Sequence, residues 1–168
     1  GTDVELGIEG RSGIADDGDL GSPGAFGNLP PGEGFIAPVE KTTNGTIVFD
    51  GSIWPLGLLE EPLAAEIKDG YIVDLQGSAA NQWRSVIEPH GQEAFAVAEL
   101  GIGTNDAATL TGNVLEDEKI LGTIHVAFGD NHTFGGNVRV SSHQDGIVLN
   151  PTVYIDDRKI LEAGELLV

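Results

Sequence analysis

The chain contains no cysteine among its 168 residues. This absence excludes disulfide bonds within the sequence, thiolate metal ligands and a cysteine nucleophile. A metal ion bound here must therefore be held by oxygen atoms and imidazole nitrogens. Long apolar runs are missing as well, and no charged start is followed by an apolar stretch. We therefore expect no membrane span and no secretory signal, and a soluble, cytoplasmic protein.

Basic residues are scarce: 8 Lys and Arg stand against 27 Asp and Glu, which gives a formal net charge of −19. Such a charge repels phosphate groups and anionic lipid headgroups, so we expect neither nucleic acid nor a membrane as a partner. The negative electrostatic potential of such a chain attracts cations instead. Acidity of this kind also serves solubility alone, so charge by itself leaves metal binding open.

Glycine, in contrast, is abundant, and the 25 glycines recur between short β-branched runs. This pattern is typical of many strands and turns. We predict an α+β, β-rich fold with a mixed or antiparallel curved sheet, or a barrel-like domain, and one main helix. The length suits a single domain, residues 1–168. The chain has no initiating methionine and begins like the middle of a sequence, so we expect it to be the C-terminal half of a longer protein.

Apolar and β-branched runs predict the strands at 34–40, 45–53, 63–77, 122–129, 137–142, 146–156 and 165–168. The Asp69-Gly70 pair predicts a two-residue hairpin turn, because both central positions of that turn favour positive φ. Residues 10–33 are rich in Gly, Pro and Asp, and we expect them to form a long surface loop that delivers residues to a site.

The main helix is predicted at about 78–88, with Ser78 as its N-cap and Pro89 just after its end. Shorter helical turns are predicted at 105–110 and around 115–119.

Two histidines, His143 and His125, are candidate metal ligands. His143 and Asp145 are two residues apart, so in a strand their side chains point to the same face and could clamp a cation. The alternative is an exposed histidine hydrogen-bonded to a neighbouring acid. His125 alternates with aliphatic neighbours in an apolar strand, and a buried imidazole there needs a partner, either a metal or a carboxylate.

Two glutamates stand out for a similar reason. Glu99 lies inside an apolar run, and Glu33 lies between a Pro-Pro-Gly turn and a strand. Each glutamate alone more often has a structural role than a metal-binding one. Together with His125, His143 and Asp145, they form a set that suits two divalent first-row ions, since carboxylates bridge and imidazoles select Zn, Co, Mn or Fe over Mg or Ca. Two such ions would activate a bridging water for hydrolysis.

At these residues the sequence resembles the metal-binding region of the aminopeptidase T and aminopeptidase S family of dimetal peptidases. The likeness runs through "GAFGNLPPGEGFIAPVE", "AELGIGTN", "EDEKILGTIHVAFG" and "SSHQDG". It implies that the metal ligands are Glu33, Glu99, His125, His143 and Asp145. It further implies two divalent ions (Zn, Co or Mn), a small peptide or other small molecule as substrate, a metal-dependent hydrolase of the aminopeptidase type, and homodimers.

One position departs from that family. The resemblance places a tyrosine seven residues after the strand histidine, where this sequence has His132. Histidine can donate a hydrogen bond or move a proton, so His132 is the candidate catalytic residue, with an exposed loop histidine as the alternative.

This departure, and the short segment between His125 and His143, keep two other hypotheses open. A related branch of the same fold family contains ring-cleaving dioxygenases of dihydroxypyridines, in which one ferrous ion is held by two His and one carboxylate, here His125, His143 and Asp145. The third hypothesis is an isolated, non-catalytic domain. Three further acids could orient the imidazoles: Glu40, Asp117 and Glu118.

Overall fold

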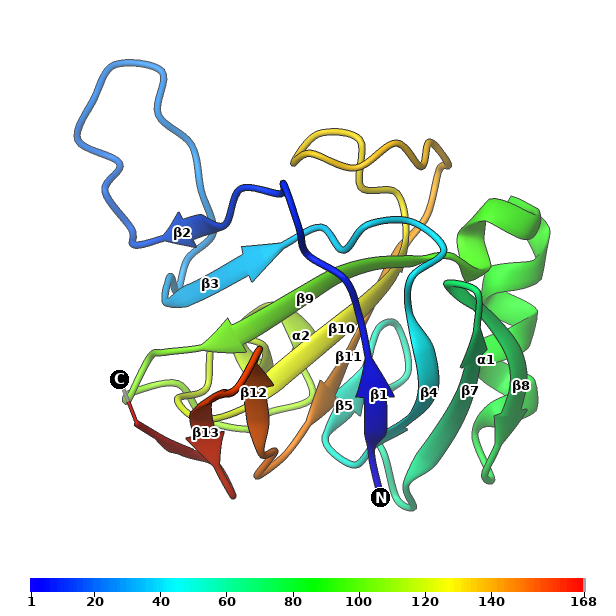
Figure 1. The fold of residues 1–168 in the computed structure, drawn as a ribbon. Helices are drawn as coiled ribbons and strands as arrows, with labels where there is room; N and C mark the ends of the chain where they lie inside the picture. Colours follow the sequence, from blue (N-terminus) through cyan, green and yellow to red (C-terminus); the bar gives the residue numbers. More distant parts are fainter. Residues whose placement is uncertain (168) are drawn as a thin grey trace.

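The computed structural model describes residues 1–167, and its strands form three sheets in which the paired strands are antiparallel (Figure 1). The largest sheet has seven strands in the order β2 (Ile14–Asp16), β3 (Glu33–Ile36), β9 (Val97–Gly103), β10 (Ile124–Gly129), β11 (His143–Val148), β5 (Ser52–Ile53) and β6 (Gly57–Leu58). β10 is its central strand, so both of its edges are paired and every residue of it is buried.

A four-stranded sheet packs beside the first, in the order β1 (Asp3–Glu5), β4 (Asn44–Phe49), β7 (Leu63–Lys68) and β8 (Tyr71–Gln76). The third sheet is small and comprises β12 (Val153–Ile155), β13 (Arg158–Glu162) and β14 (Glu165–Leu166). The helices are α1 (Ala80–Ile87) and the single turn α2 (Val114–Asp117), and short 3-10 turns follow α1 at Glu88–His90 and Gln92–Phe95. The predicted β-rich α+β class with one main helix is confirmed.

The core lies between the two larger sheets and α1. Three aromatic rings form its centre: Phe49 of β4, Trp83 of α1 and Phe128 of β10 meet edge to face, with ring centroids 5.6 to 6.2 Å apart. All three side chains are fully buried. Because strand residues alternate between faces, the apolar residues of β10 that enter this core leave His125 on the opposite face of the central strand.

The predicted hairpin turn and main helix both form, but the predicted N-cap of the helix is wrong. Asp69 and Gly70 have φ of 49° and 78° and join β7 to β8, so the predicted hairpin turn is confirmed. The main helix is also confirmed, but it begins at Ala80 after the N-cap residue Ala79, and no side chain caps it. Ser78 is therefore not the cap. α2 confirms the turn predicted around 115–119.

Two predicted elements are wrong, because side chains take the backbone groups that the elements need. In 137–142 no strand forms, since the N–H groups of Asn137, Val138 and Val140 donate to side-chain oxygens of Glu40, Asn131 and Asp130 respectively. In 105–110 no helix forms, because the Asn105 side chain accepts the N–H of Ala107 and its backbone bridges to Ile120.

The segment predicted as a long loop, 10–33, contains the short strand β2, and residues 17–32 project from the body of the molecule between β2 and β3 (Figure 1). The last predicted strand, 165–168, corresponds to β14, and its final residue lies outside the described residues.

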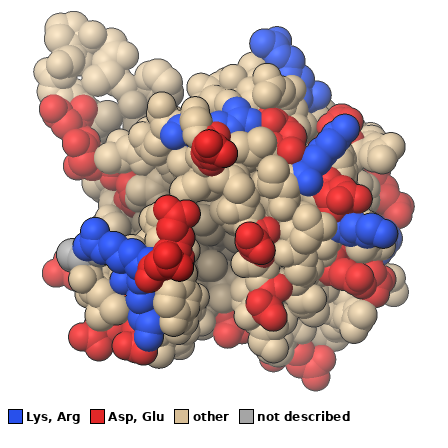
Figure 2. All heavy atoms as spheres, viewed as in Figure 1, with Lys and Arg blue, Asp and Glu red and all other residues tan. Residues whose placement is uncertain are grey.

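Acidic side chains are spread over the face seen in Figure 2, with the few basic ones interspersed among them. Among residues 1–167, no helix has the length and apolar character needed to cross a bilayer.

Candidate metal site

The register of the central strands brings the predicted ligands together on one face of the large sheet. Ala127 of β10 lies opposite Glu99 of β9 on one side and Asp145 of β11 on the other. His125 lies two residues away on β10, and the strand β3, which pairs with the other side of β9, begins with Glu33. Four strands that are distant in sequence therefore contribute to one cluster.

His125 lies at the centre of this cluster. Its ring is fully buried, and its Nε2 lies 3.2 Å from Oε1 of Glu99 and 3.1 Å from Oε2 of Glu33. One ligand atom from each of these three residues lies within 4.8 Å of the other two. The ring fits here because β9 has a glycine beside it: a Cβ on Gly101 would lie 2.0 Å from the imidazole.

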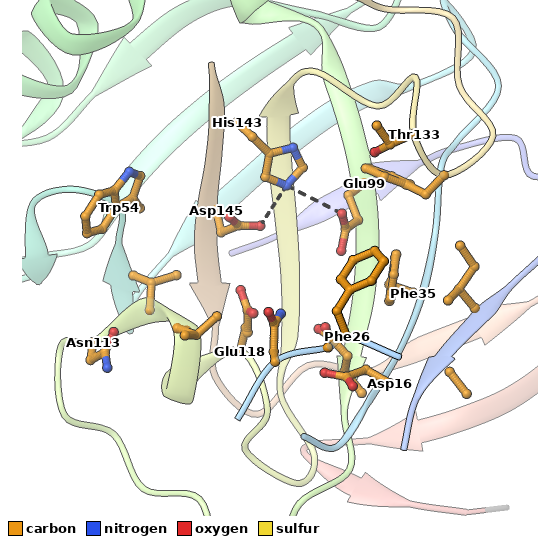
Figure 3. Close-up of a pocket in the computed structure, with 18 residues that line it drawn as sticks. Asp16, Phe26, Phe35, Trp54, Glu99, Asn113, Glu118, Thr133, His143 and Asp145 are labelled. Carbon is orange, nitrogen blue, oxygen red and sulfur yellow. Dashed lines mark ion pairs between the residues drawn. The ribbon is translucent and has the colours of Figure 1, made fainter. Parts of the chain in front are cut away.

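His143 extends the cluster toward solvent. Its Nε2 lies 3.3 Å from Oδ1 of Asp145 and 3.5 Å from Oε2 of Glu99 (Figure 3). Its Nδ1 lies 2.8 Å from the backbone carbonyl of Asp130, which fixes the orientation of the ring. The two oxygens of Glu99 thus face two different imidazoles, and this carboxylate links His125 to His143.

A lysine closes the other side of the cluster. Lys119 is fully buried, and its Nζ contacts Oε1 of Glu33 at 2.5 Å and Oε1 of Glu118 at 2.6 Å, with Oδ2 of Asp16 at 3.7 Å. Glu118 also approaches the histidines, because ligand atoms of Glu118, His125 and Asp145 lie within 4.8 Å of one another. The site thus contains five carboxylates, two imidazoles and one ammonium.

These contacts shift the pKa values of the buried groups. Burial lowers the pKa of His143, but its contacts with Asp145 and Glu99 outweigh burial and raise it to about 11. The pKa of His125 rises well above its ordinary value, because Glu33 and Glu99 outweigh complete burial. Burial alone would raise the pKa of Glu99, but the two imidazoles lower it to about 2.

The acids near Lys119 behave differently. Burial, followed by the charge of Asp145, raises the pKa of Glu118 to about 7, despite the opposing effects of His125 and Lys119. Burial lowers the pKa of Lys119, but Glu118 and Glu33 outweigh it, and the pKa lies above its ordinary value. Lys119 therefore stays charged, whereas Glu118 can exchange a proton near neutral pH.

The residues present fit a bound metal ion. Glu33 Oε2 and Asp16 Oδ2 are buried and make no well-formed hydrogen bond, although His125 Nε2 lies 3.1 Å from the first and Lys119 Nζ lies 3.7 Å from the second. Buried polar atoms without a partner are costly, and a cation removes that cost. The oxygen and imidazole donors match first-row divalent ions, so the structure contains a buried Glu and His group that could bind a metal.

The cluster opens into a pocket of about 960 Å³ (Figure 3). Four residues of the cluster line this pocket: Glu99, Glu118, His143 and Asp145. Four aromatic side chains line it as well: Phe26, Phe35, Trp54 and Phe134. Phe134 stands edge to face with both Phe35 and the His143 ring, with centroids 5.6 and 5.9 Å apart. A flat, small molecule therefore finds apolar walls beside the charged groups.

The structure gathers all five predicted ligands, but it does not bring His132 into the pocket lining. The Nδ1 atom of His132 lies 2.8 Å from Asp130, and its side chain is 35% exposed. Its neighbours Thr133 and Phe134 line the pocket instead. Within residues 1–167, no contact supports the catalytic role expected for His132, which remains a sequence-based prediction.

Of the three acids considered as orienting groups, only Glu118 faces the histidines. Glu40 pairs with Arg11 and accepts the N–H of Asn137. Asp117 accepts hydrogen bonds from Ser52 and from the loop before α2. Sequence analysis missed Lys119 and Asp16. An "EDEK" run at a helix end is ordinarily solvent-exposed, so nothing in it signals a buried lysine.

Comparisons with known proteins agree on one family. A family model described as NicX, 2,5-dihydroxypyridine 5,6-dioxygenase, matches residues 1–168. A curated 2,5-dihydroxypyridine 5,6-dioxygenase of Pseudomonas putida is 26% identical over an alignment of 159 residues, and the match covers 86% of this chain and 45% of that protein. The chain thus spans about half the length of the curated relative it matches.

Solved structures show the same fold. The structure of 2,5-dihydroxypyridine dioxygenase from Pseudomonas putida KT2440 matches with a TM-score of 0.91 and 23% identity, over 99% of this chain and 52% of that one. Wild-type AmpT from Thermus thermophilus matches with a TM-score of 0.77 and 19% identity, over 100% of this chain and 48% of that one. The expected likeness to aminopeptidase T therefore holds for the fold.

The expected function does not hold. The hypothesis of an aminopeptidase-type hydrolase, and with it a peptidase or protease, is wrong, because the family model, the curated relative and the first of these structures are all dioxygenases of dihydroxypyridine. The physical reason for the error is that five ligand residues suited to two ions do not specify how many ions bind or which reaction follows. A buried lysine among them was not foreseen.

Proposed function

The chain belongs to the 2,5-dihydroxypyridine 5,6-dioxygenase family, and from this premise we propose that it forms the metal-binding part of a ring-cleaving dioxygenase acting on a dihydroxylated pyridine. The observation that carries the proposal is the family match over residues 1–168. The convergence of two imidazoles and several carboxylates beside an aromatic-walled pocket supports it.

We propose that His125, His143 and Asp145 hold one ferrous ion, in the two-histidine, one-carboxylate arrangement used by non-haem iron oxygenases. A ferrous ion held there supplies the one-electron chemistry that lets an aromatic ring react with dioxygen. Glu99 lies between the two imidazoles and orients them, and the Asp130 carbonyl fixes the ring of His143.

The pocket suits such a substrate. Phe134 and Phe35 meet edge to face and, with Trp54, offer apolar surfaces against which a pyridine ring can pack while water is excluded. In the proposed reaction the bond between ring carbons 5 and 6 breaks, and both atoms of one O₂ enter the product. Atoms and electrons balance without a further reductant.

The test is oxygen uptake by the purified protein, loaded with Fe(II) without air and then given 2,5-dihydroxypyridine and O₂. One O₂ should disappear per ring, and both atoms of ¹⁸O₂ should appear in the product. His143→Ala should lower the rate by at least ~100-fold, because it removes a proposed ligand. His90→Ala is the matched control, because His90 is an exposed histidine bonded to Ser141.

Loss of the substrate without oxygen uptake would contradict the proposal, as would an iron-loaded protein that leaves the ring intact. An equal rate in His143→Ala and His90→Ala would remove the proposed ligand role of His143.

A further inference from the structure

The strongest unexplained feature of the site is its ammonium group. Lys119 is the only lysine or arginine that contacts the carboxylates of the cluster among residues 1–167, and its side chain is fully buried. A buried lysine is rare and costly unless its charge is compensated. Here Glu33, Glu118 and Asp16 compensate it. Such an arrangement needs a reason beyond stability, since apolar residues would fill the same space at lower cost.

Lys119 sits where the cluster would otherwise offer a second cation site. Glu33 divides its two oxygens, with Oε1 on the ammonium and Oε2 on Nε2 of His125. Glu118 likewise places Oε1 on the ammonium. On the opposite side, no lysine or arginine of the described residues contacts Glu99, His143 or Asp145. The cluster therefore has a lysine on one side, which cannot bind a cation while it is charged, and imidazoles on the other side, which are themselves metal-binding groups.

The backbone holds Lys119 in this place. Its carbonyl accepts the N–H of Asn105 at 2.8 Å, and its own N–H donates to Glu116. The strand β9 approaches so closely that a Cβ on Gly103 would lie 2.8 Å from the carbonyl carbon of Lys119. The backbone of Lys119 is therefore held in place, and its side chain reaches the acids from a fixed position.

We propose that the Lys119 ammonium occupies the place of a second divalent cation, and that its charge is what keeps a second ion out of the cluster. The proposal rests on the proposed function only in requiring that a metal binds. Repulsion between like charges excludes a second ion from Glu33 and Glu118, because their Oε1 atoms are already in contact with the ammonium. The proposed ligands His125, His143 and Asp145 keep their affinity for a single ion.

The experiment counts metal ions per chain in the purified protein after equilibrium dialysis against Mn(II), with elemental analysis and electron paramagnetic resonance as readouts. The native protein should hold one Mn(II) with the spectrum of an isolated ion. Lys119→Met keeps a long, buried side chain but removes the charge, and it should hold two ions with a spin-coupled spectrum. Lys119→Arg, which keeps the charge, should hold one.

Since Lys119→Met leaves acids uncompensated, it is prepared with Mn(II) present, and Lys119→Gln serves as the second variant if it does not fold. Two ions in the native protein would overturn the proposal, and so would no ion, or one ion in both uncharged variants. Failure of the proposed function looks different: counts of one in the native protein and two in Lys119→Met, without any oxygen uptake, leave this proposal standing.

Discussion

Replacing Gly101 by alanine adds one methyl group beside the metal cluster, and the structure gives its consequence in detail. Gly101 lies in β9 opposite His125 of β10, and its φ is not positive, so alanine fits the backbone. The new Cβ would lie 2.0 Å from both Nε2 and Cε1 of the imidazole. Carbon atoms in contact ordinarily stay about 3.5 Å apart, so the ring must move by about 1.5 Å.

That displacement exceeds what a metal site tolerates, because metal–ligand distances hold to within about 0.2 Å. We expect Gly101→Ala to weaken metal binding by at least ~100-fold. His125 is fully buried, so its ring cannot turn into solvent, and the overpacked cluster should cost about 1–3 kcal/mol of unfolding free energy. For a chain of this length, each kcal/mol lowers Tm by about 2–4 °C.

Gly34→Ala is the matched control. Gly34 lies in β3, next to β9, its φ is not positive, and a Cβ there would meet no atom closer than 4.0 Å. Calorimetric Tm and Mn(II) titration should show little change for Gly34→Ala and a loss of both stability and affinity for Gly101→Ala. If Gly101→Ala binds Mn(II) as tightly as the native protein, the placement of His125 in the metal site is refuted.

Two further predictions concern protons and packing. The pKa values of His125 and His143 both lie above their ordinary range, so a metal ion must displace a proton from each imidazole. Metal affinity should therefore rise with pH between pH 6 and 8, by up to about a hundredfold per pH unit, in buffered calorimetric titrations. A metal affinity that is independent of pH would count against both ligands. Phe128→Ala should cost about 3–5 kcal/mol in chemical denaturation, because the ring fills the core between Phe49 and Trp83. Phe26→Ala, at a side chain that is 95% exposed, should cost almost nothing, and equal costs would contradict the packing described here.

The sequence predicts well those features that depend on neighbours along the chain. The two-residue spacing of His143 and Asp145 places both on one face, and the Asp69-Gly70 turn follows from the φ preferences of two residues. Residue chemistry marks Glu33 and Glu99 as candidate ligands, but their convergence on His125 depends on strand pairing over long separations, which no local pattern predicts.

Other features could not be read from the sequence at all. Lys119 carries no local sign of burial, since its surroundings are set by β3 and β9 rather than by its own neighbours. The absence of a strand at 137–142 depends on oxygen atoms of Glu40, Asn131 and Asp130, and an apolar pattern does not reveal such competition for backbone N–H groups.

The ladder between β10 and β11 reaches Gly129 and His143, and the Asp130 N–H bonds to the Ser142 carbonyl directly beyond it. Backbone hydrogen bonds thus hold together the two ends of the thirteen-residue loop that joins these strands, and these bonds do not depend on the side chains within the loop. Thr133 and Phe134, which shape the wall of the pocket, lie within that connection. Mutation can therefore reshape what enters the pocket while the imidazoles stay in register, so substrate choice and metal chemistry can evolve separately in this scaffold.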